Sequence, residues 1–233
     1  MARRIAALLR HGDYRQRPDT PSALQPFPLN AAGEQQARAG ASQLIDDLRE
    51  RDWQLHPVID SSRLLRGWQT AQLVSEELAH LSGVSCAVDS FSHLAERSVG
   101  SAANLTVAEI EAIVEADPRY PPLPPDWKAD SHFCLPLQGA ESLLQAGERV
   151  AAHLRERMAQ LGDVPHDCVK LFVGHGAAFR HAACVLGAMP FGDIARLSMF
   201  HAVPVYLEMS DNGDWHHVGG EWKIRDARSE SLD

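Results

Sequence analysis

Apolar residues along the chain follow two patterns, and the two patterns alternate. Short uninterrupted runs, which are typical of buried strands, cover residues 4–10, 58–61, 87–91 and 168–173. Apolar positions spaced by three or four residues, which predict amphipathic helices, cover residues 31–51, 65–81, 139–162 and 177–186. Because strand and helix patterns alternate, the sequence predicts parallel βαβ units. We therefore expect an α/β fold of three layers, α/β/α, around a mostly parallel central sheet.

Residues 92–138 interrupt this alternation. Thr106 to Glu109 reads Thr-Val-Ala-Glu, a capping-box sequence that predicts a short helix ending at Ala116. The next stretch, residues 118–125, is too rich in proline for a helix or a central strand. We expect residues 92–138 to form an insertion or lid over the carboxyl ends of the strands, within a single domain of residues 1–233.

The last part of the chain returns to strand patterns. Residues 203–207, 214–218 and 222–224 predict short strands, and Asn212-Gly213 between the first two is a hairpin signal. We therefore expect a C-terminal meander on the edge of the sheet.

The composition narrows the class of protein. Hydrophobic residues make up 45% and charged residues 23% of the chain, as in ordinary globular proteins. The formal net charge of −9 opposes any general attraction to nucleic acid, and no segment predicts a membrane span. The apolar run after Met1 stops at Arg10 before it reaches signal-peptide length, and the four cysteines form no CxxC pair. A reducing cytoplasm is the expected compartment.

Two of the apolar strands end in the same pair of residues, His11-Gly12 and His175-Gly176. Ligands of open α/β sheets bind outside the carboxyl ends of the strands, so we expect both imidazoles in one crevice, where glycine lets a ligand approach the backbone. Arg10 stands beside the first histidine. Arg66 begins the helix after the second strand, and guanidinium groups bind phosphate oxygens through paired hydrogen bonds. This combination suits a phosphoryl group.

The same residues carry a resemblance to a known family. The motifs, in chain order, are Arg10-His11-Gly12, Ser61-Ser62-x-Leu64-x-Arg66-x-x-Gln69-Thr70, Leu94-x-Glu96-Arg97-x-x-Gly100 and Gly174-His175-Gly176-x-x-x-Arg180. Leu29-Asn30-x-x-Gly33-x-x-Gln36-Ala37 resembles the first helix of the same family. The chain thus resembles the histidine phosphatase superfamily, in its phosphoglycerate-mutase-like branch, from residue 4 to about residue 186.

The resemblance implies a role for each matched residue. His11 would be the nucleophile that becomes phosphohistidine, and Glu96 the proton donor. The phosphoryl group would be bound by Arg10, Arg66 and His175, with Gly12 and Gly176 beside it. It also implies a phosphatase that needs no metal or other cofactor and acts on a small phosphorylated substrate. A homodimer is an open alternative to a monomer.

The chain departs from the family pattern directly after His11-Gly12. Many relatives have an Asn soon after this motif that contacts the phosphate, whereas this chain reads Asp13-Tyr14-Arg15-Gln16-Arg17. Tyr14, Arg15 and Gln16 are all candidates for the missing contact, and the spacing does not decide among them. Arg97, Arg119, Lys128 and His132 are candidates for contacts with the substrate beyond its phosphate.

Three other functions are weighed against a small-molecule phosphatase. A metallohydrolase would use His11, Asp13, Asp60 and His175 as ligands, but no HxH or DxH cluster accompanies them. A protein that binds phosphoproteins, or dephosphorylates them, would share the fold, although a mere binder would need neither the nucleophile nor the acid. A mutase must hold a second anionic group, and residues 98–138 offer only Arg119 and Lys128 against six acidic residues. We therefore expect water to be the phosphoryl acceptor.

Overall fold

The computed structural model describes residues 2–225, and its central feature is a mixed sheet. The strands follow the order β4 (Ala87–Phe91), β3 (Val58–Ser62), β5 (Cys168–Gly174), β1 (Arg4–Arg10), β7 (Pro204–Met209) and β8 (Trp215–Gly219), with β2 (Gln54–Leu55) also paired to β5. Pairing is parallel from β4 to β1 and antiparallel from β1 through β7 to β8. The expected α/β fold with a mostly parallel sheet is confirmed.

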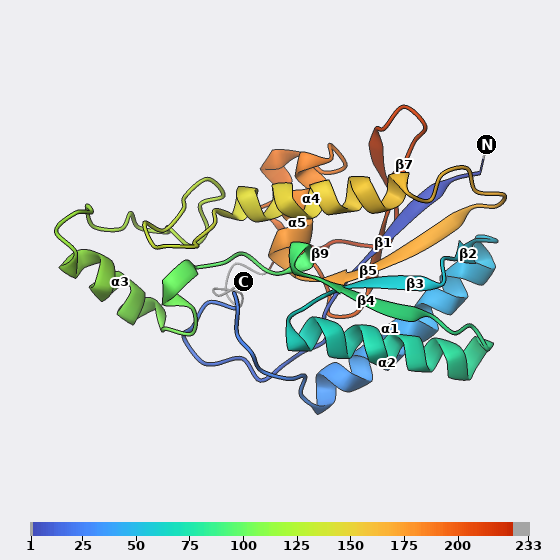
Figure 1. Cartoon of the computed structure of the whole chain (residues 1–233), viewed down its shortest axis with the longest axis horizontal. Helices are drawn as coiled ribbons and strands as arrows, with labels where there is room; N and C mark the ends of the chain where they lie inside the picture. Colours follow the sequence, from blue (N-terminus) through green and yellow to red (C-terminus); the bar gives the residue numbers. More distant parts are fainter. Residues whose placement is uncertain (1, 226–233) are drawn as a thin grey trace.

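Helices cover both faces of the sheet and form the outer two of three layers (Figure 1). α1 (Ala31–Glu50) and α2 (Leu65–Ser82) lie on one face, and α4 (Leu143–Ala159) and α5 (Gly176–Val185) lie on the other. Successive side chains of β1 point alternately into the two cores. Ile5 packs with α1 and α2, and Leu8 packs with α4 and α5. The continuous apolar run of β1 is therefore the result of burial on both faces.

Two details differ from the sequence-based expectation. α4 begins at Leu143 and not at residue 139, because the Ser142 side chain caps it in a capping box with Gln145. The edge meander is correct for β7 and β8 but wrong for residues 222–224. Here β9 (Lys223–Ile224) pairs with β6 (Leu197–Ser198) in a separate two-stranded sheet. Gly220, which has a φ of 71° and lies against the Pro204 carbonyl, turns the chain away from the main sheet.

The insertion extends beyond the carboxyl ends of the parallel strands and contains α3 (Val107–Ala116), which begins with the expected capping box (Figure 1). It has a small apolar core of its own, in which Val99, Ile110 and Trp127 are buried. Ala23, from the loop that follows β1, joins this core. The insertion and that loop thus support each other. Within residues 2–225, no helix has both the length and the apolar character that crossing a membrane requires.

A buried group of charges joins β3, β5 and α4. The Asp60 carboxylate accepts hydrogen bonds from His153 at 3.0 Å and Arg157 at 2.7 Å, and Lys170 lies 2.7 Å from it. Burial alone would raise the pKa of Asp60, but these three hydrogen bonds outweigh it and lower the pKa from 3.8 to about 2. Because the folded pKa is below the ordinary value, this stabilisation is present above about pH 4 and is lost as the pH falls through about 2.

Replacing Asp60 by Asn should therefore destabilise the fold. Lys170, only 1% exposed, would be left as a buried charge without its carboxylate, and the free energy of unfolding should fall by about 3–5 kcal/mol at pH 7. Urea denaturation measures this change. Asp89, the exposed register partner of Asp60 on β4, is the control, and Asp89→Asn should change stability by less than about 0.5 kcal/mol. Equal effects of the two substitutions would contradict this account of the cluster.

Candidate active site

The two His-Gly pairs follow the ends of two neighbouring strands, β1 and β5, and therefore lie next to each other. Arg10 at the end of β1 is in register with Gly174 at the end of β5, and the His11 N–H donates to the Gly174 carbonyl at 2.9 Å. The centroids of the two imidazole rings are 4.9 Å apart, and neither residue is more than 1% exposed. The structure thus brings His11 and His175 together, as the strand-end pattern predicts.

The hydrogen bonds of His11 determine its tautomer. Its Nδ1 lies 2.7 Å from the Gly12 carbonyl oxygen, which can only accept, so Nδ1 carries the proton. In a neutral imidazole Nε2 then has the free lone pair, and Arg66 Nε donates to it at 3.1 Å. The atom with the lone pair thus faces a cation.

Both histidines are neutral at pH 7. Burial is the largest cause, and it lowers the pKa of each well below the usual value of 6.5. The positive charges of Arg66 and Arg10 lower both pKa values further. A neutral His11 has the lone pair that a nucleophile needs.

The Nδ1 atom of His175 has no hydrogen-bond partner among the residues that the structure describes. Its Nε2 lies 2.9 Å from the Ser62 hydroxyl, which already accepts from the Leu64 N–H and is therefore able to donate its own proton. When the hydroxyl donates to Nε2, the proton of the neutral imidazole is on Nδ1. That atom is buried and makes no hydrogen bond within residues 2–225. An anion next to His11 would satisfy it.

The two arginines come from different elements. Arg66, in the first turn of α2, is completely buried, and its terminal nitrogens donate to the Gln25 and Ala23 carbonyls at 2.9 Å each. Arg10 donates to the Met199 carbonyl at 3.0 Å. A Cβ at position 176 would lie 3.2 Å from the Arg10 side chain, so Gly176 leaves space for this guanidinium group.

Glycine is required where the loop after β1 meets α1. A side chain on Gly12 would overlap the Gly33 carbonyl, and a side chain on Gly33 would overlap the Asp13 carbonyl. The backbones of the two segments are therefore in direct contact. This contact explains the position of Gly33 in the helix motif, three residues after the capping residue Asn30.

Other motif residues hold the same loop in place. Asp13 accepts from the Asn30 amide at 2.8 Å, and its N–H donates to Gln36 at 2.7 Å. Thr70 accepts from the Gly12 N–H at 3.0 Å, while Gln69 accepts from the Leu29 N–H at 2.9 Å. These polar residues position the backbone around His11.

The structure separates the three candidates that follow Asp13. Tyr14 is buried, with its ring 5.3 Å from the His11 ring and 4.6 Å from the Arg66 guanidinium. Arg15 is exposed, and Gln16 donates to the Thr20 carbonyl at 3.3 Å. Of the three, Tyr14 is the residue that lies against His11.

Glu96 and Arg97 lie in the segment after β4, and each is 8% exposed. The Glu96 carboxylate accepts from the Arg97 N–H at 2.8 Å, and its charge opposes the lowering of the Arg66 pKa that burial causes. The Arg97 guanidinium stacks near Trp127, with 5.9 Å to the ring centroid. The Glu96 charge thus acts on the same arginine that faces His11.

An ion pair that the sequence analysis missed fixes the position of Glu96. Arg149 of α4 donates to the carbonyls of His93 at 2.8 Å, Ala95 at 3.1 Å and Glu96 at 3.4 Å. Its partner Glu141, 2.8 Å away, also accepts from the Ser98 N–H at 3.1 Å. The residues on both sides of Glu96 are therefore held by Arg149 of α4 and by Glu141, which lies just before that helix.

The ring of a third histidine, His201, lies 5.9 Å from the His11 ring. The next residue, Ala202, donates its N–H to the Arg10 carbonyl at 2.8 Å, which draws this loop to the end of β1. No spacing signal connects residue 201 with residue 11, so only the fold reveals their proximity.

The proposed ligands of a metallohydrolase are not assembled. Asp60 is bonded to Lys170, Arg157 and His153, and Asp13 is bonded to Asn30. Among residues 2–225, no three histidine, cysteine or acidic side chains are grouped so that they could hold a metal ion.

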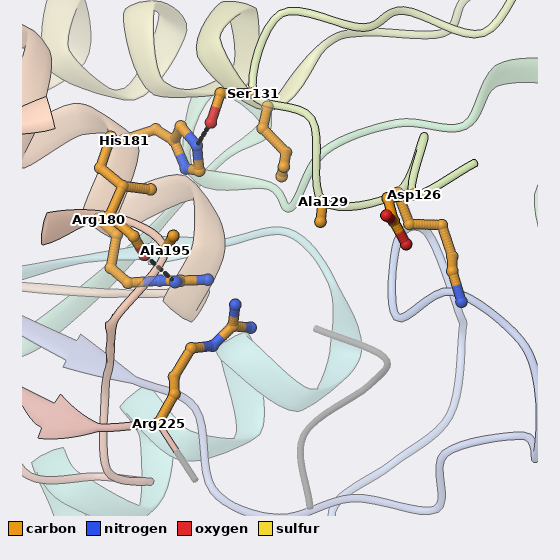
Figure 2. A pocket seen from close by; sticks show the side chains of 10 residues that line it. Asp126, Ala129, Ser131, Arg180, His181, Ala195 and Arg225 are labelled. Atoms are coloured by element: carbon orange, nitrogen blue, oxygen red, sulfur yellow. Dashed lines mark hydrogen bonds between the residues drawn. The ribbon is translucent and has the colours of Figure 1, made fainter. Parts of the chain in front are cut away.

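A cavity of about 380 Å³ lies between the insertion and α5 (Figure 2). Asp126, Lys128 and Ser131 line it from the insertion, and Arg180 and His181 line it from α5. The Ser131 hydroxyl lies 3.0 Å from His181 Nε2, which links the two walls.

The family model for the histidine phosphatase superfamily (branch 1) matches residues 6–219. The chain belongs to this family. It is a phosphatase of the histidine phosphatase type, as the sequence motifs predicted. A comparison with curated proteins gave no match.

Solved structures share the fold at low identity. A mycobacterial glucosyl-3-phosphoglycerate phosphatase is 21% identical, with a TM-score of 0.66 over 95% of this chain and 98% of that chain. A second protein, described as mycobacterial hydrolase 2, is 21% identical, with a TM-score of 0.69 over 98% and 94%. A phosphoserine phosphatase from Entamoeba histolytica is 16% identical, with a TM-score of 0.62 over 92% and 95%.

Because the loop after β1 is in direct contact with α1, we expect one Gly→Ala substitution in this helix to lower the stability of the fold and not to raise it. In an ordinary helix Gly→Ala stabilises by up to about 1 kcal/mol. At Gly33 the new Cβ would overlap the Asp13 backbone, so Gly33→Ala should instead destabilise by about 1–3 kcal/mol. Thermal unfolding measures the change. Gly192→Ala, at a position with no atom near the new Cβ, should be close to neutral. A rise in melting temperature for Gly33→Ala would refute the contact.

Proposed function

We propose that this chain is a metal-independent phosphatase that hydrolyses small phosphomonoesters through a phosphohistidine on His11. The observation that carries the proposal is the state of His11, which is neutral, has its proton on Nδ1 and has the lone pair on Nε2 next to Arg66. An imidazole in this state is a competent nucleophile at pH 7.

In the first step Nε2 of His11 forms a bond to phosphorus, and the bond from phosphorus to the ester oxygen breaks. Negative charge spreads over the three remaining phosphoryl oxygens, and Arg10, Arg66 and the Nδ1–H of His175 stabilise it. Glu96 enters this step in its protonated form and donates that proton to the departing alkoxide. The products of this step are the alcohol and phosphohistidine.

In the second step a water molecule attacks phosphorus, and the bond to Nε2 breaks. The Glu96 carboxylate, which lost its proton in the first step, accepts the proton of the water. Inorganic phosphate leaves, and His11 and Glu96 return to their starting states. Each proton and each bond is thus restored after one turnover.

The cations of the site support independence from metal ions. Arg10 and Arg66 supply the positive charge that a divalent ion supplies in other phosphatases. The carboxylates of Asp13 and Asp60, which a metal would need, are engaged in the hydrogen bonds described above.

The test of the function is phosphate release from a panel of small phosphomonoesters after exhaustive chelation. Release that persists supports the proposal, whereas loss with recovery on adding a divalent ion would restore the metallohydrolase. In parallel, 3-phosphoglycerate with catalytic bisphosphoglycerate tests for a mutase. Isomerisation faster than every hydrolysis in the panel would refute the assignment to hydrolysis.

Rapid quenching of a turnover mixture that contains labelled phosphomonoester should trap phosphate on the enzyme. Because the nucleophile is an imidazole, the label should be labile in acid and stable in base, and His11→Ala should abolish it. The exposed His216 of β8 provides the control, since His216→Ala should retain the label. A label that survives acid would assign the intermediate to another kind of side chain.

Replacing Glu96 by Gln should lower turnover by about 10²–10⁴-fold for alkyl phosphates, whose leaving groups need a proton. Aryl phosphates with acidic phenols need little protonation and should lose much less. Steady-state rates across a series of leaving groups measure the difference. Glu115→Gln, at an exposed position of α3, should change neither class of substrate. A uniform loss across the series would exclude Glu96 as the general acid.

A further inference from the structure

Three rings lie next to His11, and the proposed reaction uses only one of them. The ring centroids of His175, Tyr14 and His201 lie 4.9, 5.3 and 5.9 Å from the centroid of the nucleophile. His175 donates to the phosphoryl group, and the ring of Tyr14 lies against the Arg66 guanidinium. His201 has no part in that scheme. It is half-buried, whereas the other two residues are buried, so part of it is in contact with solvent.

The loop that carries His201 is bound to the end of β1 on both sides of this residue. The Arg10 guanidinium donates to the Met199 carbonyl at 3.0 Å, and the Ala202 N–H donates to the Arg10 carbonyl at 2.8 Å. Both hydrogen bonds involve the residue that directly precedes His11. The position of His201 relative to the nucleophile is therefore fixed through the nucleophile's own neighbour in the chain.

The backbone directly after His201 is strained. Ala202 has a φ of 54°, in the left-handed region that residues with a Cβ rarely adopt. It is only 1% exposed, and a side chain on Gly40 of α1 would overlap its carbonyl. Glycine at position 202 would make the same turn without strain but with more conformational freedom. Strain that the surrounding contacts maintain is found mainly at functional sites, and here it holds His201 in one place.

The chemistry of an imidazole suits this place. A neutral imidazole has one N–H and a protonated one has two, so His201 is a hydrogen-bond donor in either state. A hydrogen bond from a ring N–H to an oxygen spans about 2.9 Å. A phosphoryl group bonded to His11 therefore comes within reach of a ring whose centroid is 5.9 Å away.

We propose that His201 is a further phosphoryl-binding residue, which donates a ring N–H to an oxygen of the phosphoryl group that is transferred to His11. The inference rests on the proposed phosphohistidine function, and it adds a residue from a loop that the sequence motifs do not include. Because this hydrogen bond is made to the phosphoryl group and not to the leaving group, its contribution is the same for every phosphomonoester.

Three substitutions separate the N–H donor of His201 from its ring. His201→Phe keeps a ring and removes both nitrogens, whereas His201→Asn and His201→Gln place an amide N–H near the positions of Nδ1 and Nε2, respectively. His201→Phe should lower kcat/KM by about 10- to 100-fold, the effect of one lost hydrogen bond to a charged group. At least one amide variant should retain most of the activity, and the better of the two identifies the donating nitrogen.

Two readouts distinguish phosphoryl binding from support of the loop. The loss of kcat/KM in His201→Phe should be equal for alkyl and aryl phosphates, in contrast to the effect of Glu96→Gln. Isothermal titration calorimetry should show that His201→Phe weakens the binding of inorganic phosphate by about tenfold, a measurement that does not depend on turnover. His80→Phe, at an exposed position in the last turn of α2, is the matched control and should change neither readout.

Thermal unfolding verifies that each variant is folded. The two amide variants differ by one methylene, so the comparison between them holds even if the Phe ring is not accommodated.

The outcomes separate this inference from the proposed function. Wild-type kcat/KM and phosphate affinity in His201→Phe would overturn the role of His201 and leave the phosphatase function intact. A loss limited to alkyl phosphates would also contradict it, because it would place His201 beside the leaving group. A uniform loss with unchanged phosphate affinity, restored by neither amide, would show that the ring only supports the loop. Absence of phosphate release from every phosphomonoester would overturn the phosphatase function itself, and the binding measurement would still test His201.

Discussion

Two imidazoles and a guanidinium group share one buried site, and they can do so only because the imidazoles carry no charge. His11 and His175 lie within 5 Å of each other, with Arg66 bonded to the first and Arg10 nearby. A protonated histidine here would add a third cation without water to screen it. The Gly12 carbonyl therefore does more than orient the ring of His11, because it determines which nitrogen of this neutral ring has the proton.

Most of the fold was predictable because burial on two faces leaves a clear record in the sequence. The apolar runs of β1 and β5 mark strands covered by helices on both sides, and the spacing in α1 and α2 marks one buried face. The sequence-based expectations were wrong where the structure depends on a single residue and not on a repeated pattern. The start of α4 depends on one capping side chain, and the path after β8 depends on the positive φ of Gly220.

The candidate site was predictable where its residues follow strand ends or stand in motifs, as His11, His175 and Arg66 do. It was not predictable where a residue arrives from a distant segment. Arg149 of α4 reaches the backbone of Glu96 in this way. For Tyr14, which the sequence named as one of three candidates, only the path of the loop showed which of the three lies against His11.

The hydrogen bonds of Arg66 have a consequence for product release. This guanidinium donates to His11 and to the carbonyls of Gln25, Ser22 and Ala23, so four of its five N–H groups are engaged within the protein. At Arg66 an arriving phosphate therefore mostly exchanges hydrogen bonds and does not add to them, so the attraction between opposite charges is the larger part of what this arginine contributes. We therefore expect the loop carbonyls to take back these hydrogen bonds when inorganic phosphate leaves, so that release of the product is coupled to the position of the loop after β1.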